Sequence, residues 1–137
     1  MVDTALSFPT YFPPNCPPSE ASDEECILYR FCKSATLDES DFVSFFLINP
    51  EKHKDNINAY GLSTFKTIDD CKTALNKAPK LRKKYKYIAS GMTNKYRGKI
   101  LHTPSNANPS HYTWWVYEGV KPHTFFEVYG EGGDMNA

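Results

Sequence analysis

The sequence predicts an α+β fold: one compact domain in which two helices pack on a largely antiparallel, or mixed, sheet behind a Pro-rich N-terminal arm. The main observation is the order of the periodic segments, which runs strand, helix, strand, helix and then four strands. The length of 137 residues fits one domain, and a hydrophobic content of 40% is enough for a core. We therefore expect an arm over residues 1–25, the domain over 26–130 and a flexible tail over 131–137.

The arm is defined by proline. Residues 8–18 hold five of the ten prolines together with three aromatic side chains. Proline fixes φ and removes a backbone donor, so this segment is expected to be extended. The aromatic rings of Phe8, Tyr11 and Phe12 are expected to be buried away from water, which favours packing of the arm along the domain. The alternative is a short ligand for another protein, because Pro14 and Pro17 form a PxxP motif.

The first half of the domain contains the two predicted helices. Alternation in residues 26–33 predicts a strand, and phenylalanines spaced three and four apart predict a helix of about three turns over 38–50. A short strand with a glycine bend is expected over 58–65. Thr67 is then the cap of a second helix, which we expect to end before Pro79.

Four further strands are predicted in the second half. They cover residues 84–90, 97–103, 111–117 and 124–130, each bounded by Gly, Pro, Asn or Ser. If the first two form a hairpin, the loop between them presents Arg and Lys together. In the strand HYTWWVY, successive side chains point to opposite faces, so we expect one tryptophan in the core and the other near a surface or pocket.

The formal charge of zero conceals an uneven distribution. Residues 1–65 carry four basic and ten acidic side chains, residues 66–99 carry eleven and two, and residues 100–137 carry one and four. In the basic block, lysine and arginine interleave with tyrosine, a pattern typical of surfaces that bind single-stranded nucleic acid or an acidic protein. A solvated surface, paired internally with the acidic first half, is the alternative. The candidate binding residues are Lys83, Lys84, Lys86 and Arg97.

Cysteine spacing argues against a metal site. Cys16, Cys26, Cys32 and Cys71 form no C-x2-C pair, so we expect reduced thiols and no metal. Cys26, Cys32 and Cys71 lie in apolar context and are expected to act as small core residues. No apolar run approaches the ~18 residues of a membrane span, and the N-terminus lacks the pattern of a secretory signal. We therefore expect a cytoplasmic protein without a membrane partner.

His111 opens the aromatic strand, and an aromatic wall beside a histidine suits the stacking of a flat ring such as nicotinamide or adenine. Ordinary core and edge packing is the alternative. The four histidines do not supply the two H-x-[ST] motifs of a two-histidine phosphoesterase, because only His111-Tyr112-Thr113 fits.

Three short motifs, in order, resemble the ADP-ribosyltransferase-like fold. They are Tyr29-Arg30 in the first strand, the GLSTF segment 61–65 in the second, and Glu127 in the late FEV strand. The resemblance implies an enzyme that uses NAD, in which Arg30 contacts the phosphates, Ser63 supports the nicotinamide ribose and Glu127 stabilises an oxocarbenium-like transition state. The hypothesis built on it also includes His111 as a catalytic residue and places the following around the cofactor: Tyr29, Tyr60, Gly61 and Trp115.

The chain is also similar to small uncharacterised bacterial or phage proteins with an H-x-TWW segment. The leading interpretation is therefore an NAD-using ADP-ribosyltransferase-like enzyme that acts as a bacterial or phage toxin or defence factor. The second interpretation is a module without catalysis, whose basic face over residues 80–99 binds nucleic acid or an acidic protein. A phage accessory protein that inhibits a host partner belongs to this second class.

Overall fold

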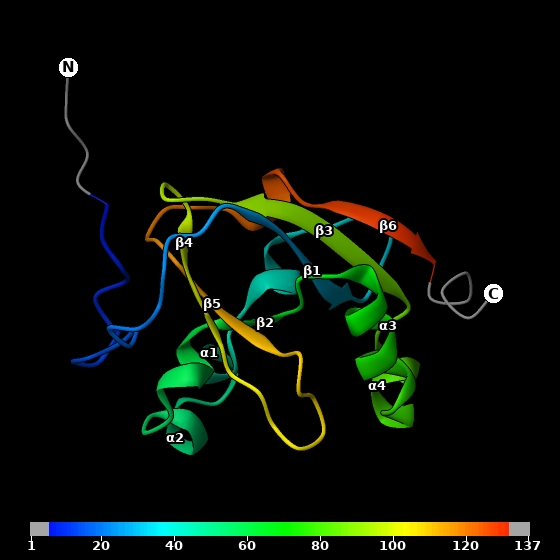
Figure 1. The fold of residues 1–137 in the computed structure, drawn as a ribbon, viewed down its shortest axis with the longest axis horizontal. Helices are drawn as coiled ribbons and strands as arrows, with labels where there is room; N and C mark the ends of the chain where they lie inside the picture. The colour runs from blue at the N-terminus through cyan, green and yellow to red at the C-terminus, as the bar shows by residue number, and fades with distance from the viewer. Residues whose placement is uncertain (1–5, 132–137) are drawn as a thin grey trace.

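The computed structural model describes residues 6–131 and confirms the α+β class (Figure 1). Within these residues, six strands form two antiparallel three-stranded sheets. The first sheet has the order β1–β3–β6, with β1 Cys26–Cys32, β3 Tyr87–Thr93 and β6 Glu127–Glu131. The second has the order β2–β5–β4, with β2 Leu62–Thr64, β5 Tyr112–Val116 and β4 Gly98–His102. The predicted tail, apart from Glu131, lies outside the described residues.

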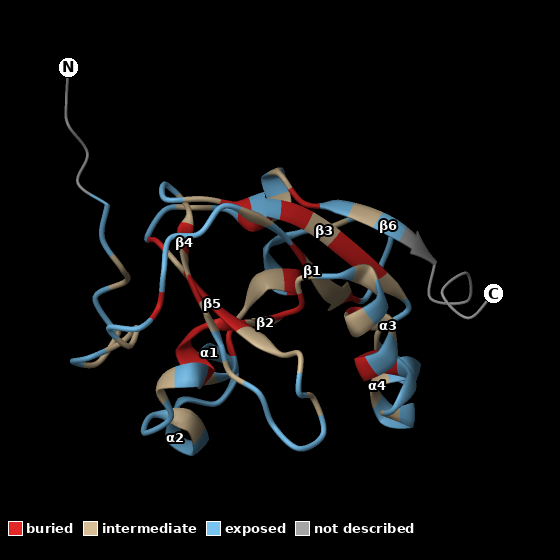
Figure 2. Cartoon of the chain, in the orientation of Figure 1, coloured by how far each residue is buried: buried red, intermediate tan, exposed pale blue. Residues whose placement is uncertain are grey.

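The two sheets meet at one bridge. Tyr29 of β1 and Phe65, just after β2, exchange two backbone hydrogen bonds of 2.8 and 2.9 Å. The main core lies where the sheets face each other and is built around Leu28, Ala89 and Trp114. Figure 2 shows the buried residues concentrated along the strands, while α2 and α4 are mostly exposed. The bridge therefore brings β1 and β2 together, although they belong to different sheets.

The second predicted helix is confirmed. α3, Ile68–Asn76, begins after Thr67, whose hydroxyl accepts a 3.0 Å hydrogen bond from the backbone N–H of Asp70. Its buried side chains cover one face of β1 and β3. Pro79 ends this helix but also opens α4, Pro79–Lys84, because proline fits the first turn of a helix. The predicted strand over 84–90 consequently begins only at Tyr87.

The first predicted helix is divided into short pieces. A 3-10 turn, Glu39–Phe42, is followed by α1, Phe45–Ile48, and α2, Pro50–His53. Each piece has its own cap, and Ser44 and Asn49 accept hydrogen bonds from the backbone N–H groups of Leu47 and Lys52. A new helix therefore begins after each of these two caps, and the spacing of the phenylalanines does not predict these breaks. Two more 3-10 turns, Ile57–Tyr60 and Pro122–Thr124, precede β2 and β6.

The hairpin between the third and fourth predicted strands does not form. β3 pairs with β1 and β6, whereas β4 pairs with β5 in the other sheet. The chain turns at residues 94–97 and leaves one sheet for the other. In Figure 1 this turn lies at the opposite end of the molecule from α4.

The described part of the arm, residues 6–25, packs on the domain, as predicted, and residues 1–5 lie outside the described residues. Ser22 pairs with Ile100 at the free edge of β4 through two backbone hydrogen bonds of 2.8 Å. The Phe8 ring lies 4.6 Å from the Tyr117 ring, and the Phe12 ring lies edge-on at 5.7 Å from the Tyr60 ring. The arm thus closes a third hydrophobic cluster, around Tyr60 and Trp115.

Candidate functional site

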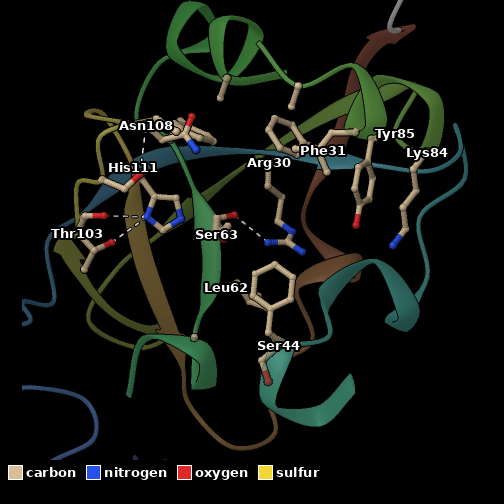
Figure 3. Close-up of a pocket in the computed structure, with 18 of the residues that line it drawn as sticks. Arg30, Phe31, Ser44, Leu62, Ser63, Lys84, Tyr85, Thr103, Asn108 and His111 are labelled. Carbon is tan, nitrogen blue, oxygen red and sulfur yellow. Dashed lines mark hydrogen bonds between the residues drawn. The ribbon is translucent and has the colours of Figure 1, made fainter. Parts of the chain in front are cut away.

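A cavity of about 500 Å³ opens between α1, β2, the α3–α4 pair and the loop 103–111 (Figure 3). Its lining is largely apolar, with Phe31, Phe65 and Tyr85 among its rings. Four residues of the proposed NAD site line it, namely Arg30, Gly61, Ser63 and His111, and the basic candidate Lys84 lines it as well. The first four come from β1, from the start of β2 and from the residue before β5, so the two sheets together build the site.

Arg30 is the centre of the cavity. Its Nη1 donates to the carbonyl oxygen of Ser63 at 2.8 Å, and its Nη2 and Nε donate to the carbonyl of Asp41 at 2.9 and 3.3 Å. A guanidinium has five N–H donors, so two of them remain for a ligand. Burial lowers the pKa of Arg30 from its ordinary value, but an arginine stays charged near neutral pH. The cavity therefore holds a fixed cation.

The charges around Arg30 are unbalanced. Lys77 and Lys84 also line the cavity, and no Asp or Glu does among the residues that the structure describes. Arg30 joins no salt bridge in residues 6–131. The Asp41 carboxylate, which still raises the pKa of Arg30 through space, accepts hydrogen bonds from the backbone N–H groups of Asp38 and Lys33 at 3.0 and 3.4 Å. A half-buried cation without a paired carboxylate favours an anionic ligand.

His111 lies on the opposite wall (Figure 3). Its Nδ1 lies 2.8 Å from the hydroxyl and 3.2 Å from the carbonyl oxygen of Thr103, and that hydroxyl lies 2.7 Å from the hydroxyl of Thr113. These contacts fix the ring through Nδ1 and leave Nε2 free of them. Burial lowers the pKa of His111, so the neutral imidazole dominates at neutral pH. A neutral ring can accept a proton or a hydrogen bond.

Ser63 lies between these two residues. It faces Thr113 across the β2–β5 pair, and its carbonyl holds Arg30. Within the described residues, no hydrogen bond links its hydroxyl to His111, so the two do not form a nucleophile and base pair in this structure. Gly61 lies close to β5, where an added Cβ would be 2.5 Å from the Thr113 methyl group. Glycine is therefore required there by close packing.

Glu127 does not join this group. It is exposed at the start of β6 and pairs with Ser90, which in turn pairs with Tyr29. Arg30 instead pairs with Ala89. Directly opposed residues share a face and neighbours along a strand alternate, so Arg30 and Glu127 lie on opposite faces of the first sheet. The acid that the resemblance implies is absent from the lining of the cavity.

The expected aromatic wall does not form either. Trp114 and Trp115 are both fully buried, so neither reaches the surface, although Trp114 lines a separate cavity of about 200 Å³ beneath the arm. Trp115 lies under the arm, and its Nε1 donates to the carbonyl of Ile57 at 3.1 Å. Tyr60 is buried in the same cluster and Tyr29 packs beside α3. None of these lines the larger cavity, because the arm and α3 cover them.

The four basic candidates separate into two places. Lys83, Lys84 and Lys86 are exposed at α4 and just beyond it, and Lys84 also reaches the cavity mouth. Arg97 belongs to the distant turn before β4, where it donates to the carbonyl of Met92 and lies 3.7 Å from the centre of the Phe125 ring. The loss of the hairpin accounts for this separation.

The sequence did not indicate the loop 103–111 or Lys77 as parts of the site. Thr103 and Asn108 line the cavity only because β4 and β5 bring both ends of the loop beside β2. One signal was present: no Asp or Glu occurs between Asp70 and Glu118. That acid-free stretch supplies about half of the lining residues, including Lys77 and Lys84.

The predicted core role is confirmed for Cys32 and Cys71, whereas Cys26 and Cys16 are only half-buried. All four are free thiols, Cys32 and Cys71 are buried, and burial raises the pKa of Cys32 to about 12. Within residues 6–131, no three His, Cys, Asp or Glu side chains are grouped so as to hold a metal ion. The helices in this range are all too short or too polar to cross a membrane.

Comparison with known proteins finds no matching family model, no similar curated protein and no similar solved structure. The function is therefore inferred from the cavity itself.

Proposed function

We propose that the cavity binds an anionic nucleotide, with NAD as the ligand that the resemblance to ADP-ribosyltransferase-like proteins implies. The observation that carries the proposal is the charge of the lining, which includes Arg30, Lys77 and Lys84 and no described carboxylate. Cations in a partly enclosed, low-dielectric site attract phosphate more strongly than cations on an open surface. The two free donors of Arg30 suit a bidentate contact with phosphate oxygens.

The rest of the lining fits the remainder of a nucleotide. Phe31, Phe65 and Tyr85 offer apolar surface for a base or nicotinamide ring. Ser63, Asn108 and His111 supply polar groups for ribose hydroxyls and ring edges (Figure 3). Phosphate, sugar and ring therefore each meet residues of suitable chemistry within one cavity.

ADP-ribosyl transfer is the reaction we propose for this site, without a direct role for Glu127. The bond between ribose and nicotinamide would break, nicotinamide would leave with the bonding electron pair, and an acceptor would bond to the ribose. The proton of the acceptor would go to Nε2 of His111, which is neutral because of burial. Action as a cytoplasmic toxin or defence factor of bacterial or phage origin belongs to the same proposal.

Calorimetric titration with NAD and AMP tests the binding step. Each lost charge-assisted contact costs about 1.5–3 kcal/mol, so Arg30→Gln should weaken NAD binding by roughly tenfold to a hundredfold. Lys77→Gln with Lys84→Gln, both exposed, should weaken binding without affecting the fold. Lys52→Gln with Lys95→Gln is the matched control, because it removes the same charge from exposed sites outside the cavity.

Release of nicotinamide tests the reaction. The wild-type chain with NAD and a cell lysate should release nicotinamide and transfer label, and His111→Ala should lose this activity while it still binds NAD. Equal binding by the wild type, Arg30→Gln and the lysine pair variants would contradict the proposal at its first step.

A second candidate function is binding without chemistry, to nucleic acid or to an acidic protein. Within the described residues, one ion pair joins the basic block 66–99 to the acidic first half of the chain, between Lys66 and Glu24 at 2.7 Å. The lysines and arginine of α4 form no ion pair in residues 6–131, so they remain available to a partner.

A further inference from the structure

The region around α4 is a dense basic surface, which we call the α4 surface. It comprises six exposed cations within ten residues: Lys77, Lys80, Arg82, Lys83, Lys84 and Lys86. In the part of the chain that the structure describes, none of the six joins a salt bridge. The nearest acids along the chain are Asp70 before it and Glu118 after it. This positive charge is therefore not neutralised by local carboxylates.

The α4 surface is continuous with the cavity. Lys77, at the end of α3, and Lys84, at the end of α4, belong to both, because each is exposed and each lines the cavity. Figure 3 shows Lys84 beside Tyr85, on the same wall as Arg30 and Phe31. A ligand that reaches Arg30 therefore enters past the first cations of this surface.

A free nucleotide does not account for all of these cations. The two phosphates of a dinucleotide are matched by Arg30, Lys77 and Lys84. Lys80, Arg82, Lys83 and Lys86 would still face solvent without an anion. A chain of phosphates engages both sets, because it continues past the mouth along α4.

We propose that the α4 surface binds single-stranded nucleic acid, with one nucleotide of the strand in the cavity and its neighbouring phosphates on α4. This inference rests on the proposed function, because it uses the same nucleotide cavity and adds the strand to which the nucleotide belongs. Single strands are favoured over duplexes since a base inside a duplex has to be extruded before it can enter a cavity. Rings at the wall, Phe31 and Tyr85, suit stacking on an unpaired base.

Fluorescence anisotropy with a labelled 12-nucleotide strand at low salt tests the inference. The strand should bind at least about tenfold more tightly than AMP, and its affinity should fall steeply with salt as counterions are displaced. The double variant Lys80→Glu with Lys83→Glu should reduce the affinity for the nucleic-acid strand by about tenfold or more and leave the affinity for AMP within twofold of the wild type. AMP and NAD should compete with the strand.

The matched control is Lys52→Glu with Lys95→Glu, which changes the net charge equally at exposed sites away from α4 and should have little effect. The inference is overturned if the two double variants weaken the strand equally, or if a duplex or poly-glutamate binds as well as the single strand. Binding of AMP with no gain for the strand overturns this inference alone and leaves the proposed function intact. Strand binding that neither AMP nor Arg30→Gln affects also overturns this inference alone, because it shows that the strand does not enter the cavity, whereas calorimetry measures nucleotide binding to the cavity separately.

Discussion

The guanidinium of Arg30 in β1 donates a 2.8 Å hydrogen bond to the carbonyl oxygen of Ser63 in β2, and so connects the two sheets by a side chain. The same guanidinium holds the carbonyl of Asp41 in the 3-10 turn before α1. One residue therefore joins β1, β2 and the turn before α1, and it supplies the central charge of the cavity. Structure and ligand recognition are coupled at this position.

Replacement of Arg30 should lower stability as well as affinity. Arg30→Gln leaves the carbonyls of Asp41 and Ser63 without their donors, which should reduce the free energy of unfolding by about 1–3 kcal/mol. Arg30→Lys retains the charge but not the planar guanidinium with its five N–H donors, so its free energy of unfolding should lie between those of the wild type and Arg30→Gln. Urea denaturation followed by circular dichroism measures both variants, and wild-type stability in Arg30→Gln would show that these hydrogen bonds contribute little.

Glu127→Gln should leave NAD affinity unchanged. The side chain is exposed on the face of the first sheet opposite to Arg30, outside the cavity. Calorimetric titration of this variant beside the wild type checks the expectation. A loss of affinity comparable with that of Arg30→Gln would mean that the late acid acts at the site after all.

Gly61→Ala should destabilise the fold by about 1–3 kcal/mol through overpacking. The new methyl group would lie 2.5 Å from the Thr113 Cγ2 and 3.0 Å from the Trp114 carbonyl oxygen. Thr113→Ser removes that methyl group and retains the hydroxyl that contacts Thr103, so it should restore part of the loss. A double-mutant cycle by chemical denaturation measures the coupling between the two sites, and strictly additive effects would contradict the contact.

Stability should decline in weak acid because of His111. Burial lowers its pKa below the ordinary value of 6.5, so the unfolded chain takes up a proton before the folded chain does. The contribution of His111 is thus fully present above pH 6.5 and is lost as the pH falls toward the folded pKa. NMR titration of the ring, folded and in urea, gives both values, and His111→Gln should remove this part of the pH dependence. A folded midpoint at or above the urea value would contradict the account.

The thiols should react slowly in the native protein. Burial raises the pKa of Cys16 to about 11 and that of Cys32 to about 12, and it also raises the pKa of Cys26 and Cys71. Little thiolate is therefore present at pH 8. Labelling with an aromatic disulfide reagent should be slow until urea unfolds the chain, whereas rapid native labelling of one cysteine would identify a reactive thiol.

Several features of the fold could be predicted because local chemistry determines them. The cap at Thr67, the alternation in β1 and the aromatic strand β5 all lie where the sequence indicates. The division of residues 38–53 into short helices could not be predicted, because the capping hydrogen bonds of Ser44 and Asn49 interrupt the single helix that the phenylalanine spacing indicates. Neither could α4, since Pro79 both ends one helix and begins the next.

The site was predictable in part. Arg30, Gly61, Ser63 and His111 line one cavity. Glu127 and Trp115 lie outside it. The sheet face of Glu127 depends on the strand register, and the burial of Trp115 depends on the arm that packs over it; residue spacing alone predicts neither the register nor the position of the arm. The loop from Thr103 to His111 carries no motif, so only the pairing of β4 with β5 places it beside Ser63.

The most direct test of the central claim is an NMR titration of the isotope-labelled chain with NAD, observing backbone amides and the Nε–Hε group of Arg30. We predict saturable shifts at Arg30, Ser63, Asn108 and His111, with none at Glu127 or in the turn that holds Arg97. Absence of shifts around the cavity at millimolar NAD, or shifts confined to surfaces outside it, would contradict the assignment of the cavity as a nucleotide site.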